Sequence, residues 1–125
     1  MKKEIENIND IKFLMDSFYA KVKQDVLIGP IFNHVIQDHW NEHLEKIYRF
    51  WETVLLGGHT YSGSPFFPHA KLPLEKNHFD RWLLLFKETL DEHFIGEKAN
   101  EAVWRAEKMA EMFLYKIEYI KQNKQ

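Results

Sequence analysis

The chain has 125 residues, of which 45% are hydrophobic and 29% are charged. A chain of this length has room for one hydrophobic core, so we expect one globular domain over residues 1–125. The 17 Lys and Arg residues and the 19 Asp and Glu residues leave a formal charge of -2. This balance excludes the strongly basic field with which nucleic-acid-binding proteins attract phosphates.

The sequence contains no cysteine, which excludes disulfides, thiolate nucleophiles, iron–sulfur clusters and thioether-linked cofactors. Any metal must then bind histidine or a carboxylate. No apolar run approaches the length of a signal or membrane segment, so we expect a cytoplasmic protein without a membrane partner. The 10 Phe, 5 Tyr, 4 Trp and 7 His residues exceed what a small helical core needs. This excess suggests a bound cofactor.

The first predicted element is an amphipathic helix from residue 9 to about residue 26, with Asn9 or Asp10 as its N-cap. Tyr19 lies on the edge of its apolar stripe, about 80° from Ile11 when each residue turns by 100°. The Tyr19 hydroxyl can therefore face the interior while the ring packs. The stripe itself consists of Ile11, Leu14, Met15, Phe18 and Val22.

Two further helices are predicted before the middle of the chain. Gly29-Pro30 ends the first segment and precedes a short helix over residues 31–36. A long helix follows Asp38, a candidate N-cap, and stops at Gly57-Gly58. His43 lies on one flank of this helix, at the margin of an apolar face. The inward positions are Trp40, Leu44, Ile47, Trp51, Val54 and Leu55, and Phe50 shares the flank of His43.

The second half of the chain contains an irregular segment and two more helices. Residues 57–68 show no periodicity, and Pro68 and Pro73 bracket about one turn that contains His69. Helices are predicted from about residue 74 to residue 94 and from Glu97 to about Lys121. No strand-like alternation and no internal repeat compete with this pattern, so the predicted fold class is all-α. The apolar positions of the two helices are Phe79, Trp82, Leu83, Phe86 and Leu90, then Ala99, Val103, Ala106, Ala110, Phe113, Leu114 and Ile117.

The string His39-Trp40-Asn41-Glu42-His43 matches the H-x-x-E-H pattern of some zinc hydrolases. Its two histidines, four positions apart on a helix, can grip zinc while Glu42 acts as a general base. Catalytic zinc also needs a third protein ligand, and so short a string arises easily by chance. A zinc hydrolase stays one alternative. A helical interaction module without a cofactor, whose aromatic residues only fill the core, is another.

His69 is a candidate axial ligand of a haem iron, because its position between two prolines is fixed and it does not belong to a helix face. Haem needs a neutral imidazole whose second ring nitrogen is hydrogen-bonded, and a flat apolar slot that excludes water. The many aromatic residues suit such a slot. A loop histidine is more often an exposed polar residue, and Tyr19 and Trp82 also fit ordinary core positions. The residues alone therefore leave open whether they form a haem site or are ordinary surface and core residues.

Eight short motifs follow one another along the chain. They are Phe18-Tyr19, Gly29-Pro30-Ile31-Phe32, Trp40-x-x-His43, Phe50-Trp51, Leu55-Leu56-Gly57, Tyr61-x-Gly63, His69-x-x-Leu72 and Phe79-x-x-Trp82-Leu83-x-x-Phe86. Each motif is unspecific, but their order and spacing from about residue 11 to residue 113 resemble the group III truncated haemoglobins of bacteria. The resemblance implies a two-over-two helical sandwich that encloses a noncovalent haem b.

The resemblance also implies roles for individual residues. His69 corresponds to the proximal iron ligand, Tyr19 to the distal tyrosine, His43 to the residue beside the ligand and Trp82 to the pocket tryptophan. The residues expected to contact the haem or to lie near it are Phe32, Ile47, Phe50 and Trp51.

The implied function is the binding of dioxygen, nitric oxide or another diatomic ligand at ferrous iron. The Tyr19 hydroxyl and the Trp82 indole N–H then stabilise negative charge on the ligand in a low-dielectric pocket. Such a polar pocket suits nitric oxide dioxygenation or peroxide reduction better than bulk oxygen transport, and turnover needs a separate reductase. Lys71 and Arg105 are candidates for binding the haem propionates.

Overall fold

The computed structural model describes residues 2–59, 61 and 72–123, and its helices confirm the predicted all-α fold class. Every predicted helix is present, and the observed bounds lie within a few residues of the predicted ones. None of the described helices is both long enough and apolar enough to cross a membrane. The helices are α1 (Ile8–Gln24), α2 (Gly29–Ile36), α3 (Trp40–Leu56), α4 (Lys76–His93) and α5 (Glu97–Asn123).

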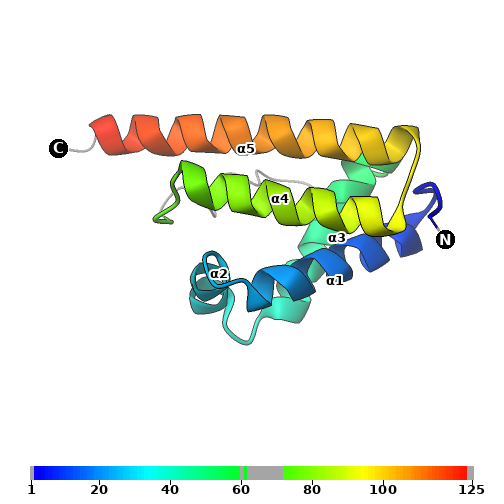
Figure 1. Ribbon diagram of the computed structural model, residues 1–125, viewed down its shortest axis with the longest axis horizontal. Coiled ribbons are helices and arrows are strands. Elements are labelled where there is room, and N and C mark those ends of the chain that lie inside the picture. The colour runs from blue at the N-terminus through cyan, green and yellow to red at the C-terminus, as the bar shows by residue number, and fades with distance from the viewer. Residues whose placement is uncertain (1, 60, 62–71, 124–125) are drawn as a thin grey trace.

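α1 packs against both α3 and α4, and α4 packs in turn against α5 (Figure 1). The long helices α4 and α5 run antiparallel beside each other, and α1 lies along the opposite side of α4. α3 contacts both α1 and α5, so the four long helices surround a common interior. The short α2 leads from the end of α1 into α3. Buried side chains at the centre include Phe18, Trp51, Leu55, Phe86 and Ala106.

The helix caps differ from the predicted ones. α1 begins at Ile8 because Asn7 is its N-cap: the Asn7 Oδ1 accepts the Asp10 N–H at 3.1 Å, and the Asp10 carboxylate accepts backbone N–H groups in return. Asp10 therefore occupies the N3 position of a capping box, and neither Asn9 nor Asp10 is the cap. His39, and not Asp38, occupies the N-cap of α3, without a side-chain cap hydrogen bond. Gly57 ends α3 as predicted, with a left-handed φ of 74° that suits glycine.

The corner between α1 and α2 also differs from the sequence interpretation. α1 already ends at Gln24, and Gly29 and Pro30 are the first residues of α2. Proline is favoured in the first helical turn, because a backbone N–H at that position has no hydrogen-bond partner within the helix and proline loses nothing by lacking it. The two residues thus start a helix and do not end one.

Gly29 allows the backbones of α1 and α2 to approach closely. A Cβ at this position would lie 2.8 Å from the Lys23 carbonyl oxygen and 3.0 Å from that of Val22. Both atoms belong to the backbone of α1, so the two helices would have to separate. We expect Gly29→Ala to lower the free energy of unfolding by about 1–3 kcal/mol, the usual cost of overpacking. Urea denaturation measures this loss.

Gly58→Ala is the matched control for Gly29→Ala. A Cβ at Gly58 would approach only the side chain of Glu52, with the nearest atom at 3.0 Å. Because this side chain can move, we expect the free energy of unfolding to change by less than about 0.5 kcal/mol. Equal destabilisation by the two variants would show that the close approach at Gly29 is not the cause.

Candidate functional site

A cavity of about 250 Å³, partly open to the surface, lies between the four long helices and the beginning of α2. Most of its wall is apolar and much of it is aromatic. The apolar wall consists of Ile28, Phe32, Ile47, Phe50, Trp51, Leu74, Phe79, Met109, Ala110 and Phe113. The residues with a polar group on the wall are Tyr19, His43, Lys46, Tyr61, His78 and Trp82.

The cavity brings together every predicted pocket residue that the structure describes. These residues are Tyr19, Phe32, His43, Ile47, Phe50, Trp51 and Trp82. His69 and Lys71, the predicted iron ligand and propionate partner, lie outside the described residues. Arg105 lies on the exposed face of α5, pairs with Glu101 at 2.8 Å and is absent from the cavity wall.

Tyr19 and Trp82 both lie at the cavity wall, and their electrostatics are linked. Burial raises the pKa of Tyr19 to about 12, against an opposing effect of the hydrogen bond with Trp82. An indole nitrogen can only donate, so the Tyr19 oxygen accepts the Trp82 N–H. The Tyr19 hydroxyl therefore keeps its proton at neutral pH. Its O–H group can donate a hydrogen bond to another group.

A layer of stacked rings holds Trp82 in place. The rings of Trp82 and Phe86 are stacked with centroids 5.5 Å apart, and Trp51 stacks on Phe86 at 5.3 Å. Phe18 packs edge-on against Trp82 at 5.4 Å. Three of these four residues are buried, and interdigitated aromatic rings have little freedom to change rotamer. This packing gives the Trp82 indole a defined orientation toward Tyr19.

His43 lies at the margin of the apolar face of α3, as the sequence predicted, and is half-buried. Its ring is perpendicular to those of Tyr19 and Trp40, with centroids 6.5 and 6.0 Å away. The ammonium group of Lys23 lies 4.5 Å above the Trp40 ring, in a cation–π arrangement. Lys46, one turn beyond His43, also lines the cavity. The sequence analysis missed Lys46, although its spacing from His43 places both on one flank.

His78 is a second cavity-lining imidazole that the sequence analysis did not assign. Its Nδ1 accepts the Glu75 N–H at 2.9 Å and so helps to cap α4. A neutral ring with this hydrogen bond carries its proton on Nε2. Neither nitrogen then offers a free lone pair to a metal. Of the six described histidines, only His43 and His78 line the cavity.

The H-x-x-E-H string does not form a metal site in the described part of the chain. The His39 side chain is 65% exposed and lies 3.4 Å from the Glu42 carboxylate, whereas His43 faces the cavity. Among residues 2–59, 61 and 72–123, no group of three or more His, Asp or Glu side chains could hold a metal ion. The described residues therefore supply no third ligand to the zinc interpretation.

The residues of the cavity fit a haem. A flat apolar macrocycle requires aromatic and aliphatic walls, and its two carboxylates require cations or donors. Among the described residues, the cavity offers ten apolar side chains together with Lys46, Tyr61 and His78. The composition of the wall thus suits the polarity of the cofactor that the motifs imply.

Comparison with known proteins identifies a family. The family model "Bacterial-like globin" matches residues 4–115. The group 3 truncated haemoglobin ctb of Campylobacter jejuni is 41% identical over 123 residues, which cover 93% of this chain and 97% of that protein. The crystal structure of the group III truncated haemoglobin from Campylobacter jejuni superposes with a TM-score of 0.85 at 39% identity, over 94% of this chain and 95% of the other. Sequence and structure comparisons therefore agree.

Proposed function

Because the chain belongs to the bacterial-like globins and is a group III truncated haemoglobin, a haem globin that binds diatomic ligands, we propose that it serves oxygen, nitric oxide or peroxide chemistry. Bulk oxygen transport is the less suitable role. The observation that carries this proposal is the pair of the buried Tyr19 and the partly buried Trp82 at the cavity wall. A donor fixed in a low-dielectric pocket slows ligand release, and fast release is what transport needs.

We propose a noncovalent haem b as the cofactor, with His69 as its axial ligand. The aromatic wall would hold the macrocycle, and Lys46 and Lys71 are candidates for its carboxylates. When bound, the haem supplies a ferrous iron that takes up the diatomic ligand. The absence of cysteine requires that the cofactor be held without thioether bonds.

The chain's own contribution is a hydrogen bond to the ligand. The Tyr19 hydroxyl remains protonated because burial raises its pKa to about 12. Accepting the Trp82 N–H fixes the Tyr19 oxygen in position and leaves its proton to point elsewhere. A preorganised O–H donor stabilises a ligand that gains negative charge on binding, without the reorganisation that water would need. The His43 ring lies 6.5 Å from the Tyr19 ring, which supports our proposal that His43 contacts the same ligand.

Nitric oxide dioxygenation and peroxide reduction both consume electrons. The described residues form a single helical sandwich around one cavity of this kind, so we propose that a separate reductase restores the ferrous state. A protein of this function would oxidise after one turnover in the purified form and regain activity when a suitable reductase is added.

A visible spectrum tests the proposed function. Protein expressed with ample haem is recorded in the ferric, ferrous and ferrous carbon monoxide forms, and its iron and zinc contents are measured. We expect an intense Soret band that shifts between the three forms, with stoichiometric iron and negligible zinc. Stoichiometric zinc without colour, lost in His39→Ala, would support the hydrolase instead. Protein that contains no bound metal and shows no Soret band would support a cofactor-free module.

A further inference from the structure

Asp25 is a buried carboxylate outside the cavity that joins the α1–α2 corner to α4. Its side chain is only 3% exposed. One carboxylate oxygen accepts the N–H groups of Leu27 and Ile28, each at 3.0 Å, and the other accepts the Arg81 Nε–H at 2.6 Å. Burial raises the pKa of Asp25, but the hydrogen bonds from Ile28 and Arg81 outweigh this effect and hold the pKa below its usual value. Asp25 is therefore a charged partner of Arg81.

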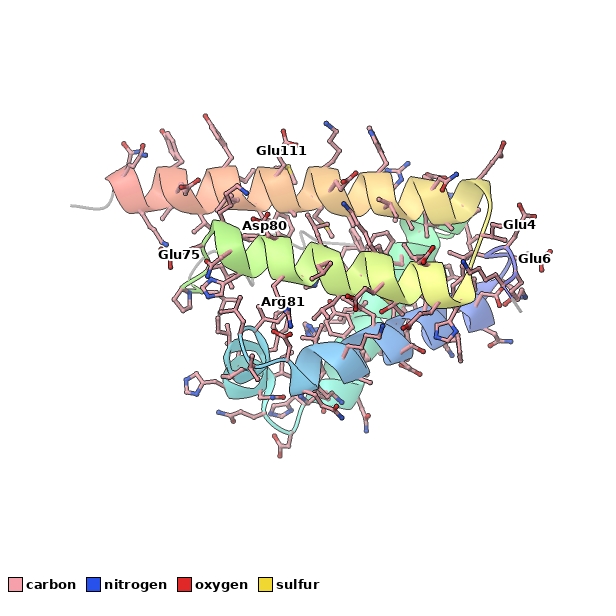
Figure 2. All side chains as sticks on the ribbon, viewed as in Figure 1. Glu4, Glu6, Glu75, Asp80, Arg81 and Glu111 are labelled. Atoms are coloured by element: carbon pink, nitrogen blue, oxygen red, sulfur yellow. The ribbon has the colours of Figure 1, made fainter. Side chains whose placement is uncertain are left out.

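The two helices that meet at the Asp25–Arg81 ion pair, α1 and α4, also carry Tyr19 and Trp82. Asp25 caps the C-terminus of α1, the helix of Tyr19. Arg81 directly precedes Trp82 on α4, and Figure 2 shows its side chain reaching from α4 toward the end of α1. Successive helical residues point about 100° apart. Arg81 can thus reach Asp25 while Trp82 faces the cavity.

We infer that the Asp25–Arg81 ion pair is a positioning device that keeps the Trp82 indole in hydrogen-bonding register with the Tyr19 hydroxyl. The inference rests on the proposed function, because it concerns the group that would hold the ligand. The ion pair with Asp25 fixes Arg81, and with it α4, against the end of α1. The Asp25 carboxylate is itself held in place, because it accepts two backbone N–H groups. A hydrogen bond weakens steeply with misalignment, so a small shift of α4 changes the Tyr19 donor.

Arg81→Gln tests the inference, since it removes the charge but leaves the Asp25 turn intact. We expect dioxygen release to accelerate by roughly three- to tenfold, a part of the effect of removing the Trp82 donor itself. The C–O stretching band of the carbon monoxide adduct should shift or split toward that of Trp82→Phe. Arg81→Lys keeps the charge and should restore part of the wild-type rate and band.

Tyr48→Phe is the matched control. It removes the hydrogen bond from Tyr48 on α3 to Asp16 on α1, which joins two helices away from Arg81, and Tyr48 does not line the cavity. We expect it to lower stability but to leave the C–O band and the release rate unchanged. Wild-type values in Arg81→Gln, or equal changes in both variants, would overturn the inference. If Tyr19→Phe and Trp82→Phe also left the release rate unchanged, the proposed role of the cavity pair would fail instead.

Discussion

The His69→Ala variant is expected to purify largely without haem. His69 is the proposed axial ligand, and the described histidines offer no ready replacement: four of the six do not line the cavity. His78 does, but its Nδ1 is bound to the Glu75 N–H. Loss of a residue that merely supports a metal ligand already weakens metal binding 10- to 100-fold, so we expect haem content to fall by at least about tenfold.

Added imidazole should restore a defined spectrum to His69→Ala, because the free base can take the place of the missing side chain. His43→Ala and His78→Ala are the controls, and both should retain haem. The measurement is the ratio of Soret to protein absorbance, with haem quantified separately after extraction. Retention of haem in His69→Ala together with its loss in His43→Ala or His78→Ala would disprove the assignment of His69.

The sequence was sufficient for the helices because their hydrophobic periodicity is strong. It placed Tyr19 on the inner edge of α1 and His43 at the margin of α3, and both line the cavity. The caps were less predictable, since Asn7 and Asp10 satisfy each other's backbone groups in a capping box and a single candidate cap residue does not reveal this. Helix ends depend on such local hydrogen bonds more than on periodicity.

Contacts between distant residues could not be predicted from periodicity. The Asp25–Arg81 pair joins residues 56 positions apart, and only the packing of α4 on α1 brings them together. The same holds for Tyr19 and Trp82, which lie 63 positions apart and meet at the cavity wall only through the tertiary fold. Whether the Trp82 N–H acts on the ligand directly, as the sequence analysis expected, or through Tyr19 stays a prediction. His78 escaped notice because its cap hydrogen bond and its place on the cavity wall both depend on the tertiary fold.

Removing the Tyr19 hydroxyl should produce the largest change in ligand kinetics. A hydrogen bond to a partly charged acceptor contributes about 1.5–3 kcal/mol, so Tyr19→Phe should accelerate dioxygen release by roughly ten- to a hundredfold. Carbon monoxide carries less charge on its outer atom and should respond less. Because the pKa of Tyr19 is raised to about 12, the wild-type rate should not vary with pH across the neutral range, where the hydroxyl stays protonated.

The double mutant decides how Trp82 acts. If the indole N–H works by fixing the Tyr19 oxygen, Trp82→Phe accelerates release in the wild-type background and has little further effect once the hydroxyl is gone. If Trp82 donates directly to the ligand, its removal still accelerates release in Tyr19→Phe. Stopped-flow release rates of the four proteins give this coupling. A Tyr19→Phe rate within about twofold of wild type, which corresponds to only about 0.4 kcal/mol, would reduce Tyr19 to a packing residue.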